Sequence, residues 1–340
     1  MRRSGERLLR ELPEAARQRL DLAEVGEVVS HAIAAEVPHD GVRLLATCPS
    51  AGLPMGSFSF WHGYEPEFGR ELLRGYYLGD DPVPPEALAR RSTPLDVLGP
   101  DHRLLTEHEI GSELRLLLRD DSGVWGVLGL TRAEGRDPFD RGDACRAADL
   151  ARPLMAALRE YVRAGPLAPV VPPLPAGVIV LGPDHRVRAV TPQAFQWLER
   201  LRGGRPSPEW IAESFLVGLS SAARRGARGP LAGATAWGPP ITHGRWVTYQ
   251  GQPLDADGVG DVAVVIQAAT GPQLLPVLCD WYGISHRERQ IVEDLYDGAA
   301  PKQVARRRGL SVHTVNDHLK SVFRKTGAGG RDELIAAVTG

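Results

Sequence analysis

Lysine is nearly missing from this chain of 340 residues. Only three of its 40 basic residues are lysines, namely Lys302, Lys320 and Lys325. A P-loop needs a lysine that reaches the nucleotide phosphates, a protein kinase needs one on its third strand, and a Schiff-base enzyme uses one as its nucleophile. None of these three kinds of site can therefore lie within residues 1–301, which contain no lysine.

Cysteine is also scarce. Cys48, Cys145 and Cys279 are far apart and form no Cys-x-x-Cys pair, so we expect neither a disulfide framework nor a structural zinc site. His102 and His108 do not have the spacing that places two zinc ligands on one helix face. A Gly-x-Ser-x-Gly nucleophile elbow is missing from the sequence as well. We therefore expect no metal, no cofactor and no enzymatic activity.

Long apolar segments are missing too. Residues 164–183 carry no charge, but several prolines prevent a continuous membrane-spanning helix there. Arg2 and Arg3 are not followed by an apolar region, so a signal peptide is not expected. The composition, with 43% hydrophobic and 24% charged residues, is typical of a soluble protein. We expect a cytoplasmic, multidomain protein without a membrane partner.

The first half of the chain alternates predicted helices and strands. Its apolar residues recur at helical spacing in some segments and alternate in others. The turn at 121–123 joins two of the strands as a hairpin. The last helix could pack on its own sheet or form a dimer. The predicted elements are a helix over 22–33, strands at 42–46, 56–60, 114–118 and 124–130, and a helix over 143–162.

This order of elements, with a turn leading into Phe139, resembles a GAF domain of the α+β class. The resemblance covers residues 20–163 and leaves 1–19 as an N-terminal helical extension. An aromatic segment between the predicted strands could form a pocket for a small molecule, or could serve core packing alone. The pocket candidates are Phe60, Trp61, Tyr64, Tyr76, Tyr77 and Asp80.

A second α+β domain is predicted after a proline-rich linker at 164–175, which we expect to be stiff and extended. Strands at 178–181 and 187–190, helices at 194–201 and 209–223, and strands at 245–250 and 262–267 follow. This order resembles a PAS domain over 176–268. His185 and His243 are expected to be surface residues rather than ligands of a bound group. Residues 269–283 are expected to be a further linker.

The C-terminal segment contains the sharpest motif of the chain. Pro301 suits the first position of a helix, and Gly309 suits its end. Ser311 is a typical N-cap for a second helix that follows at once. Ser285 and Glu288 have the spacing of a capping box at the start of an earlier helix. A small residue at Ala305, the glycine and a branched apolar residue at the corner favour a helix-turn-helix.

The second of these helices has one apolar and one polar face. Val315, Leu319 and Val322 fall on a stripe that would be buried. The opposite face is polar, and from residue 301 to 326 seven basic residues accompany a single acidic one, Asp317. In a chain whose net charge is −2, positive charge is therefore concentrated where phosphates of nucleic acid would bind.

These residues resemble the LuxR-type DNA-binding domain, also called LuxR/FixJ. The family usually has a serine or threonine cap where Ala300 stands and a polar cap where Gly330 stands, so two helix starts are weakened. Receiver domains often precede this family and carry an essential lysine, so residues 1–280 do not form one. The matching segments are Ser285–Arg289, Lys302–Ala305, Leu310–Leu319, Phe323–Gly327 and Arg331–Leu334.

The resemblance implies an all-α domain of four helices over 284–340 that binds double-stranded DNA as a homodimer. Asn316, Asp317 and Lys320 occupy the base-facing positions of the family. The N-terminal domains would then sense a small molecule or mediate dimerisation. Two alternatives are a sensing or interaction module whose C-terminal helices dock a protein partner, and an enzymatic pocket within 1–165. The residues expected to contact phosphate or to position the domain are Lys302, Ser311, His313, Thr314, Arg324 and Lys325.

Overall fold

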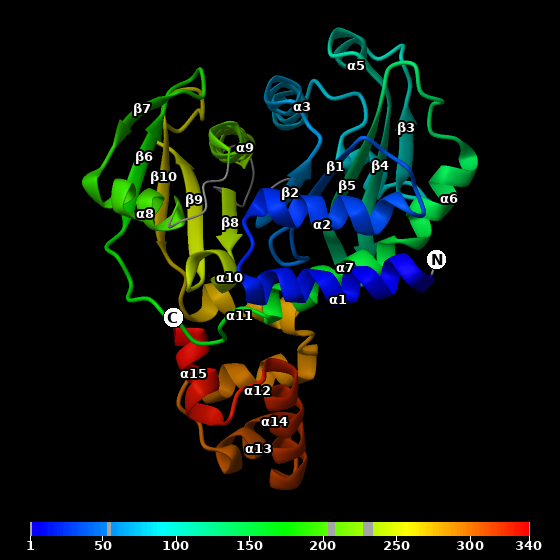
Figure 1. The fold of residues 1–340 in the computed structure, drawn as a ribbon. Helices are drawn as coiled ribbons and strands as arrows, with labels where there is room; N and C mark the ends of the chain where they lie inside the picture. The colour runs from blue at the N-terminus through cyan, green and yellow to red at the C-terminus, as the bar shows by residue number, and fades with distance from the viewer. Residues whose placement is uncertain (1, 53–55, 203–207, 227–233, 340) are drawn as a thin grey trace.

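A computed structural model describes residues 2–52, 56–202, 208–226 and 234–339. It contains two antiparallel five-stranded sheets with helices, and a C-terminal group of helices below them (Figure 1). Both sheets have the same strand order: the second, first, fifth, fourth and third strand of each unit lie side by side. Among the described residues, no helix has the length and apolar character needed to cross a bilayer.

The first sheet is built as the sequence predicts in its main hairpin, β4–β5, although both strands are longer than expected. Helix α2 crosses β2 closely at Gly26. A Cβ at this position would lie 2.2 Å from the carbonyl oxygen of Trp61, so the close crossing requires glycine. The elements are α1 (Arg2–Gln18), α2 (Leu22–Ala34), β1 (Gly41–Ala46), β2 (Phe58–His62), α3 (Pro66–Leu78), α4 (Pro85–Ala89), β3 (Leu95–Leu98), α5 (Arg103–Glu107), β4 (Ile110–Asp120), β5 (Gly123–Ala133), α6 (Arg141–Asp149) and α7 (Ala151–Arg163).

The single helix predicted over 143–162 is two helices, α6 and α7, which meet at Leu150. Pro153 has no backbone N–H to donate to the carbonyl one turn earlier, and it is tolerated only in the first turn of a helix. The junction is therefore placed just before the proline. Helix α7 packs on α1 and β4, so packing within its own unit uses much of its apolar face.

The second sheet lies beside the first, with helices α3 and α9 side by side between them (Figure 1). The sequence analysis missed strand β8 in this sheet and β3 in the first one, and it predicted the other strands with boundaries within a few residues. The elements are β6 (Gly177–Leu181), β7 (Val187–Val190), α8 (Pro192–Arg202), α9 (Glu209–Gly226), β8 (Ala234–Gly238), α10 (Pro240–His243), β9 (Val247–Pro253) and β10 (Val262–Ala268).

The segment expected to be a linker at 269–283 is helix α11 (Gly271–Tyr282). The linker prediction is corrected here because this helix is largely buried. Leu274, Leu278 and Trp281 are fully buried in the same apolar cluster as residues of the first sheet. The cluster continues into Val322 and Leu334 of the C-terminal helices. Helix α11 therefore joins the first unit to the C-terminal group through a continuous core.

The C-terminal group lies below the two sheets and begins directly after α11 (Figure 1). Ser285 caps its first helix: the hydroxyl accepts from the Glu288 N–H, and the Glu288 carboxylate accepts from the Ser285 N–H. A small core of its own includes Ile291, Leu295 and Val315, all buried. The helices are α12 (His286–Tyr296), α13 (Pro301–Arg308), α14 (Val312–Thr326) and α15 (Arg331–Thr339).

Candidate nucleic-acid interface

Helices α13 and α14 form the tight corner that the sequence predicts. Gly309 ends α13 with a φ of 63°, a left-handed conformation that glycine adopts without a Cβ penalty. Ser311 then starts α14, and its hydroxyl accepts a hydrogen bond of 3.0 Å from the Thr314 N–H. Val304 and Ala305 of α13 are buried with Val315 of α14, which holds the two helices together.

Ala300 begins α13 without a side-chain acceptor, as the sequence analysis noted. Gln303 supplies part of what is missing, because its side-chain oxygen accepts from the Ala300 N–H at 2.8 Å. One backbone donor at the start of the helix is therefore satisfied. The N–H of Gln303 donates to the Ala300 carbonyl at 2.8 Å, which tightens this first turn.

The three predicted base-reading residues lie together on one exposed face of α14. Asn316, Asp317 and Lys320 are all exposed. Asp317 lies 3.3 Å from the His313 imidazole and 3.6 Å from the Lys320 ammonium. Exposed contacts of this kind contribute little to the stability of the domain. These side chains can therefore leave one another and bind groups on DNA at a small cost in free energy. The face presents one amide, one carboxylate and one ammonium group at helical spacing.

Four of the predicted phosphate-contacting residues fall into two groups. Lys302 and Arg324 are exposed cations. Ser311 and Thr314 are occupied at the N-cap, where their hydroxyl oxygens lie 2.8 Å apart and Ser311 accepts from the Thr314 backbone. The sequence analysis did not select Arg306, although its side chain is exposed in the last turn of α13. Its position within the basic run was the available signal.

Lys325 is held inside the domain by a carboxylate. Its ammonium nitrogen lies 2.6 Å from the Glu288 Oε2, and the Glu288 side chain is only 6% exposed. Burial alone would raise the pKa of Glu288, but the hydrogen bonds from Lys325 and from the Ser285 backbone hold it at about 2, below its ordinary value of 4.5. Lys325 therefore fastens α14 to the start of α12, which a purely phosphate-contacting role would not involve.

Two arginines of the basic run also have partners within the domain. Arg308 Nε lies 2.5 Å from the buried Asp294 carboxylate, and its Nη2 donates to the Gln290 carbonyl at 3.0 Å. The hydrogen bond that Arg308 donates to this carboxylate raises the pKa of Arg308. Arg307 approaches the same carboxylate at 3.5 Å. The charge available to DNA is thus smaller than the count of basic residues from 301 to 326 suggests.

The Glu288–Lys325 pair predicts a pH dependence of stability. Glu288→Gln keeps a side-chain acceptor for the cap but removes the charge, so we expect the variant to unfold at a lower temperature than the wild type at pH 7. A depressed carboxylate pKa contributes stability above the unfolded value of about 4.5, and this contribution is lost as the pH falls toward 2. Thermal unfolding between pH 7 and pH 3 should therefore show the two proteins converging below about pH 4.5. A difference that stays constant over this range would contradict the assignment.

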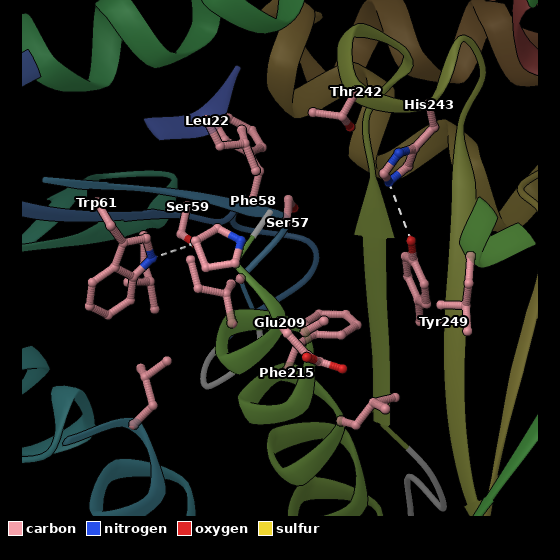
Figure 2. A pocket seen from close by; sticks show the side chains of 18 of the residues that line it. Leu22, Ser57, Phe58, Ser59, Trp61, Glu209, Phe215, Thr242, His243 and Tyr249 are labelled. Atoms are coloured by element: carbon pink, nitrogen blue, oxygen red, sulfur yellow. Dashed lines mark hydrogen bonds between the residues drawn. The ribbon is translucent and has the colours of Figure 1, made fainter. Parts of the chain in front are cut away.

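The predicted ligand pocket is only partly assembled. Trp61 and Tyr77 line a cavity of about 710 Å³, but this cavity lies between the two sheets and is completed by the second unit (Figure 2). Phe60 is instead packed edge-on against Tyr161 in the first core, and Tyr64 stacks on Phe68. Tyr76 is buried beside Tyr77, and Asp80 is exposed at the end of α3.

His243 is the residue that the sequence analysis misplaced. It was expected on the surface, but its side chain faces the cavity beside Tyr249 (Figure 2). No local pattern marks it, because its neighbours in the cavity come from distant parts of the chain. Within the described residues, no group of His, Cys, Asp and Glu side chains is arranged to hold a metal ion.

The C-terminal helices match a known family. The family model for bacterial regulatory proteins of the luxR family matches residues 283–338. A search among curated proteins finds no match to the chain. The match spans the four helices α12 to α15, including the corner between α13 and α14 and the exposed face of α14.

The similarity of the chain to solved structures is low. The chain is similar to Escherichia coli SdiA, at 14% identity over 92% of this chain and 89% of that one, with a TM-score of 0.30. A GAF domain of a phosphoenolpyruvate-protein phosphotransferase from Coxiella burnetii is 16% identical over 46% of this chain and 92% of that one, with a TM-score of 0.29. The phage VqmA–DPO complex is 17% identical over 48% and 82%, with a TM-score of 0.20.

TM-scores this low do not assign a function to the first 270 residues, so the functional conclusion depends on the family match and on the geometry of α13 and α14. The match and the geometry agree on the same segment, since the capped corner and the exposed polar face both lie inside it. Residues 283–338 are a helix-turn-helix DNA-binding domain of the luxR family of bacterial regulatory proteins.

Proposed function

We propose that this protein is a sequence-specific transcription regulator that inserts α14 into the major groove of DNA. The observation that carries the proposal is the exposed face formed by Asn316, Asp317 and Lys320, directly after the helix-turn-helix corner. An amide can pair with adenine, a carboxylate can accept from the cytosine amino group, and an ammonium can donate to guanine. Together these three groups can distinguish base pairs through the major-groove edges.

The exposed cations around this face would hold the domain on the phosphates. Lys302 at the start of α13, Arg306 at its end and Arg324 near the end of α14 are exposed cations of this set. Such contacts set affinity and register but do not read the sequence. Ser311 and Thr314 support the same role by fixing the start of α14, which places His313 at the edge of the surface.

Asp317 has a particular role in this proposal. A carboxylate that lies near the DNA backbone is repelled by the phosphates. The carboxylate of Asp317 therefore favours binding only where it contacts the edge of a base. Its contacts with His313 and Lys320 are exposed and can be given up on binding. We propose that Asp317 discriminates against sites without a matching donor, which increases specificity more than affinity.

The rest of the proposal concerns assembly and control. A single domain of this size makes few contacts, so we propose that a homodimer binds two half-sites related by its two-fold axis. The two sheet units are proposed to respond to a small-molecule effector and to transmit the response through α11. The buried position of α11 between the first core and α15 supports this route.

Replacing Lys320 should separate base reading from phosphate binding. We expect Lys320→Ala to weaken binding to the preferred site by about 1–3 kcal/mol and to bring its affinity closer to that for other sequences. Lys302→Ala should instead weaken binding to all sequences alike and lower the slope of log K against log salt by about one. Binding would be measured by fluorescence anisotropy at several salt concentrations, with a site selected from random DNA.

Arg90→Ala is the matched control, because Arg90 is an exposed cation at the end of α4, in the first unit. It should change neither affinity nor salt slope. If Lys320→Ala and Lys302→Ala both behave like this control, the face of α14 does not contact DNA. In that case a role of these helices in docking a protein partner becomes the better explanation.

A further inference from the structure

A cavity lies between the two sheets, outside the DNA-binding domain. It has a volume of about 710 Å³, within the range of small-molecule sites. Trp61 on β2 and Tyr161 on α7 line it from the first unit, and Phe215 on α9 and Tyr249 on β9 line it from the second (Figure 2). Neither unit would form this cavity alone, since each supplies only part of the wall.

Two polar atoms in the wall have no hydrogen-bond partner among the described residues. The Ser57 Oγ and the His243 Nδ1 are both buried, and they come from different units. The other ring nitrogen of His243 is engaged, because its Nε2 lies 3.3 Å from the Tyr249 hydroxyl. A buried polar atom without a partner is destabilising, so a ligand that supplies a partner to each of these atoms gains affinity from both hydrogen bonds.

The charge of the wall restricts the ligand. Burial lowers the pKa of His243 to about 4, so its imidazole is neutral at physiological pH. Among the described residues, the lining contains no lysine or arginine, and its acids are Asp21 and Glu209. The Asp21 carboxylate is already used at the start of α2, where it accepts from two backbone N–H groups. An anionic ligand would therefore find acids and no cation, which disfavours it.

We propose that this cavity binds a neutral, mostly apolar small molecule whose polar groups pair with Ser57 and His243, so that the ligand joins the two sheet units. The proposal deepens the effector-sensing part of the proposed function and rests on it. Most of the remaining lining is aromatic or aliphatic, as in Phe58, Ile179 and Ile266, and suits an apolar body. The molecule needs a carbonyl or hydroxyl group to pair with each of the two polar side chains.

The cavity is connected to the helix that leads to the DNA-binding domain. Phe58 lines the cavity, and its ring centroid lies 5.9 Å from that of Trp281 in α11. Tyr161 also lines it and packs against Phe58 at 5.4 Å. Two residues after Tyr161, Arg163 donates to the Trp281 carbonyl at 3.1 Å. An occupant that moves either aromatic ring therefore acts on α11 directly.

The test uses the purified full-length protein and Nile red, a neutral apolar dye that carries a carbonyl acceptor. We expect saturable binding with one dye per chain. Ala212 lines the cavity from an exposed position on α9, so Ala212→Trp should fill it without harming the fold and should weaken the dye at least tenfold. Glu213→Trp is the matched control, because the next residue on the same helix is exposed and does not line the cavity. It should bind as the wild type does.

Two further measurements test the chemistry of the site. His243→Phe removes the free nitrogen while keeping an aromatic ring, and should weaken the dye about fivefold. The anionic dye 1-anilinonaphthalene-8-sulfonate should compete poorly with Nile red. Absence of saturable Nile red binding to the wild type, or equal binding by Ala212→Trp and Glu213→Trp, would overturn the proposal, as would preference for the anionic dye.

The DNA-binding assay keeps this proposal separate from the proposed function. If Ala212→Trp loses the dye and retains wild-type affinity for the selected DNA site, the cavity is a ligand site on a working regulator. If the wild type binds DNA but no dye, only the cavity proposal fails. If it binds the dye but shows no salt-dependent DNA affinity, the proposed function fails and the ligand site stands.

Discussion

Replacing Arg115 by methionine is expected to lower the free energy of unfolding of the first unit by about 3–5 kcal/mol, the usual cost of removing one partner from a buried ionic group. Its guanidinium is 4% exposed and lies 2.6 Å from the Asp81 carboxylate and 2.8 Å from that of Glu113. Burial alone would lower the pKa of Arg115, but the two carboxylates raise it above its ordinary value. The charge is therefore retained in the core.

The loss of stability arises from the two buried carboxylates that lose the Arg115 guanidinium as a partner. Glu113 is fully buried and would keep one partner, Arg43, at 3.1 Å. Asp81, with a side chain only 6% exposed, would lose its ion pair and remain charged in a poorly solvated position. Methionine fills part of the volume but neutralises neither acid. Chemical denaturation, followed by circular dichroism, gives the change in free energy.

Two comparisons identify the cause of this loss. Arg103→Met removes an arginine that is 89% exposed and paired with Glu107, and it should leave the free energy of unfolding almost unchanged. Adding Asp81→Asn to Arg115→Met removes the stranded charge and should restore part of the stability. Equal small effects for Arg115→Met and Arg103→Met would show that the buried network does not stabilise the fold.

The C-terminal domain could be predicted closely because its signals are local. A capping serine, a glycine at a helix end and an apolar stripe act within one or two turns, so Ser311 and Gly309 identified the helix boundaries without knowledge of the fold. The family match confirms the assignment of this segment. The roles of individual DNA-facing residues remain predictions, because they depend on the partner.

The contact between Lys325 and Glu288 could not be predicted from local sequence signals. The two residues are 37 positions apart, and their meeting depends on how α14 packs against α12. The same limit applies to the buried charges of the first unit, since Arg43 and Glu113 are 70 positions apart. A count of basic residues cannot separate cations with internal partners from those free to meet DNA.

The cavity and helix α11 were missed for different reasons. The cavity is formed by residues of both sheet units, so no single segment carries its pattern. For α11 a signal did exist: Leu274, Leu278 and Trp281 have the spacing of one helix face, and all three are buried. Pro276 lies inside the helix, where it removes one backbone hydrogen bond, and a proline at such a position weakens the helical pattern of the segment.

Trp281→Ala is expected to loosen the connection between the sheet units and the DNA-binding domain. Trp281 is fully buried, and its ring meets that of Trp125 edge-on with centroids 5.6 Å apart. Truncating a buried tryptophan costs about 3–5 kcal/mol. The helix-turn-helix core around Val315 belongs to a separate apolar cluster, so it should remain folded. Hydrogen exchange measured by mass spectrometry should show faster exchange across α11 while α14 stays protected.

Trp197→Ala provides the matched control, because Trp197 is also fully buried but lies in the second sheet unit, away from α11. It should destabilise that unit by a similar amount and leave exchange in α11 unchanged. DNA binding gives the functional counterpart: Trp281→Ala should keep its affinity for the selected site within a few fold. Faster exchange in α11 for both variants alike would mean that Trp281 has no special part in joining the domains, and that the coupling proceeds through the shared core as a whole.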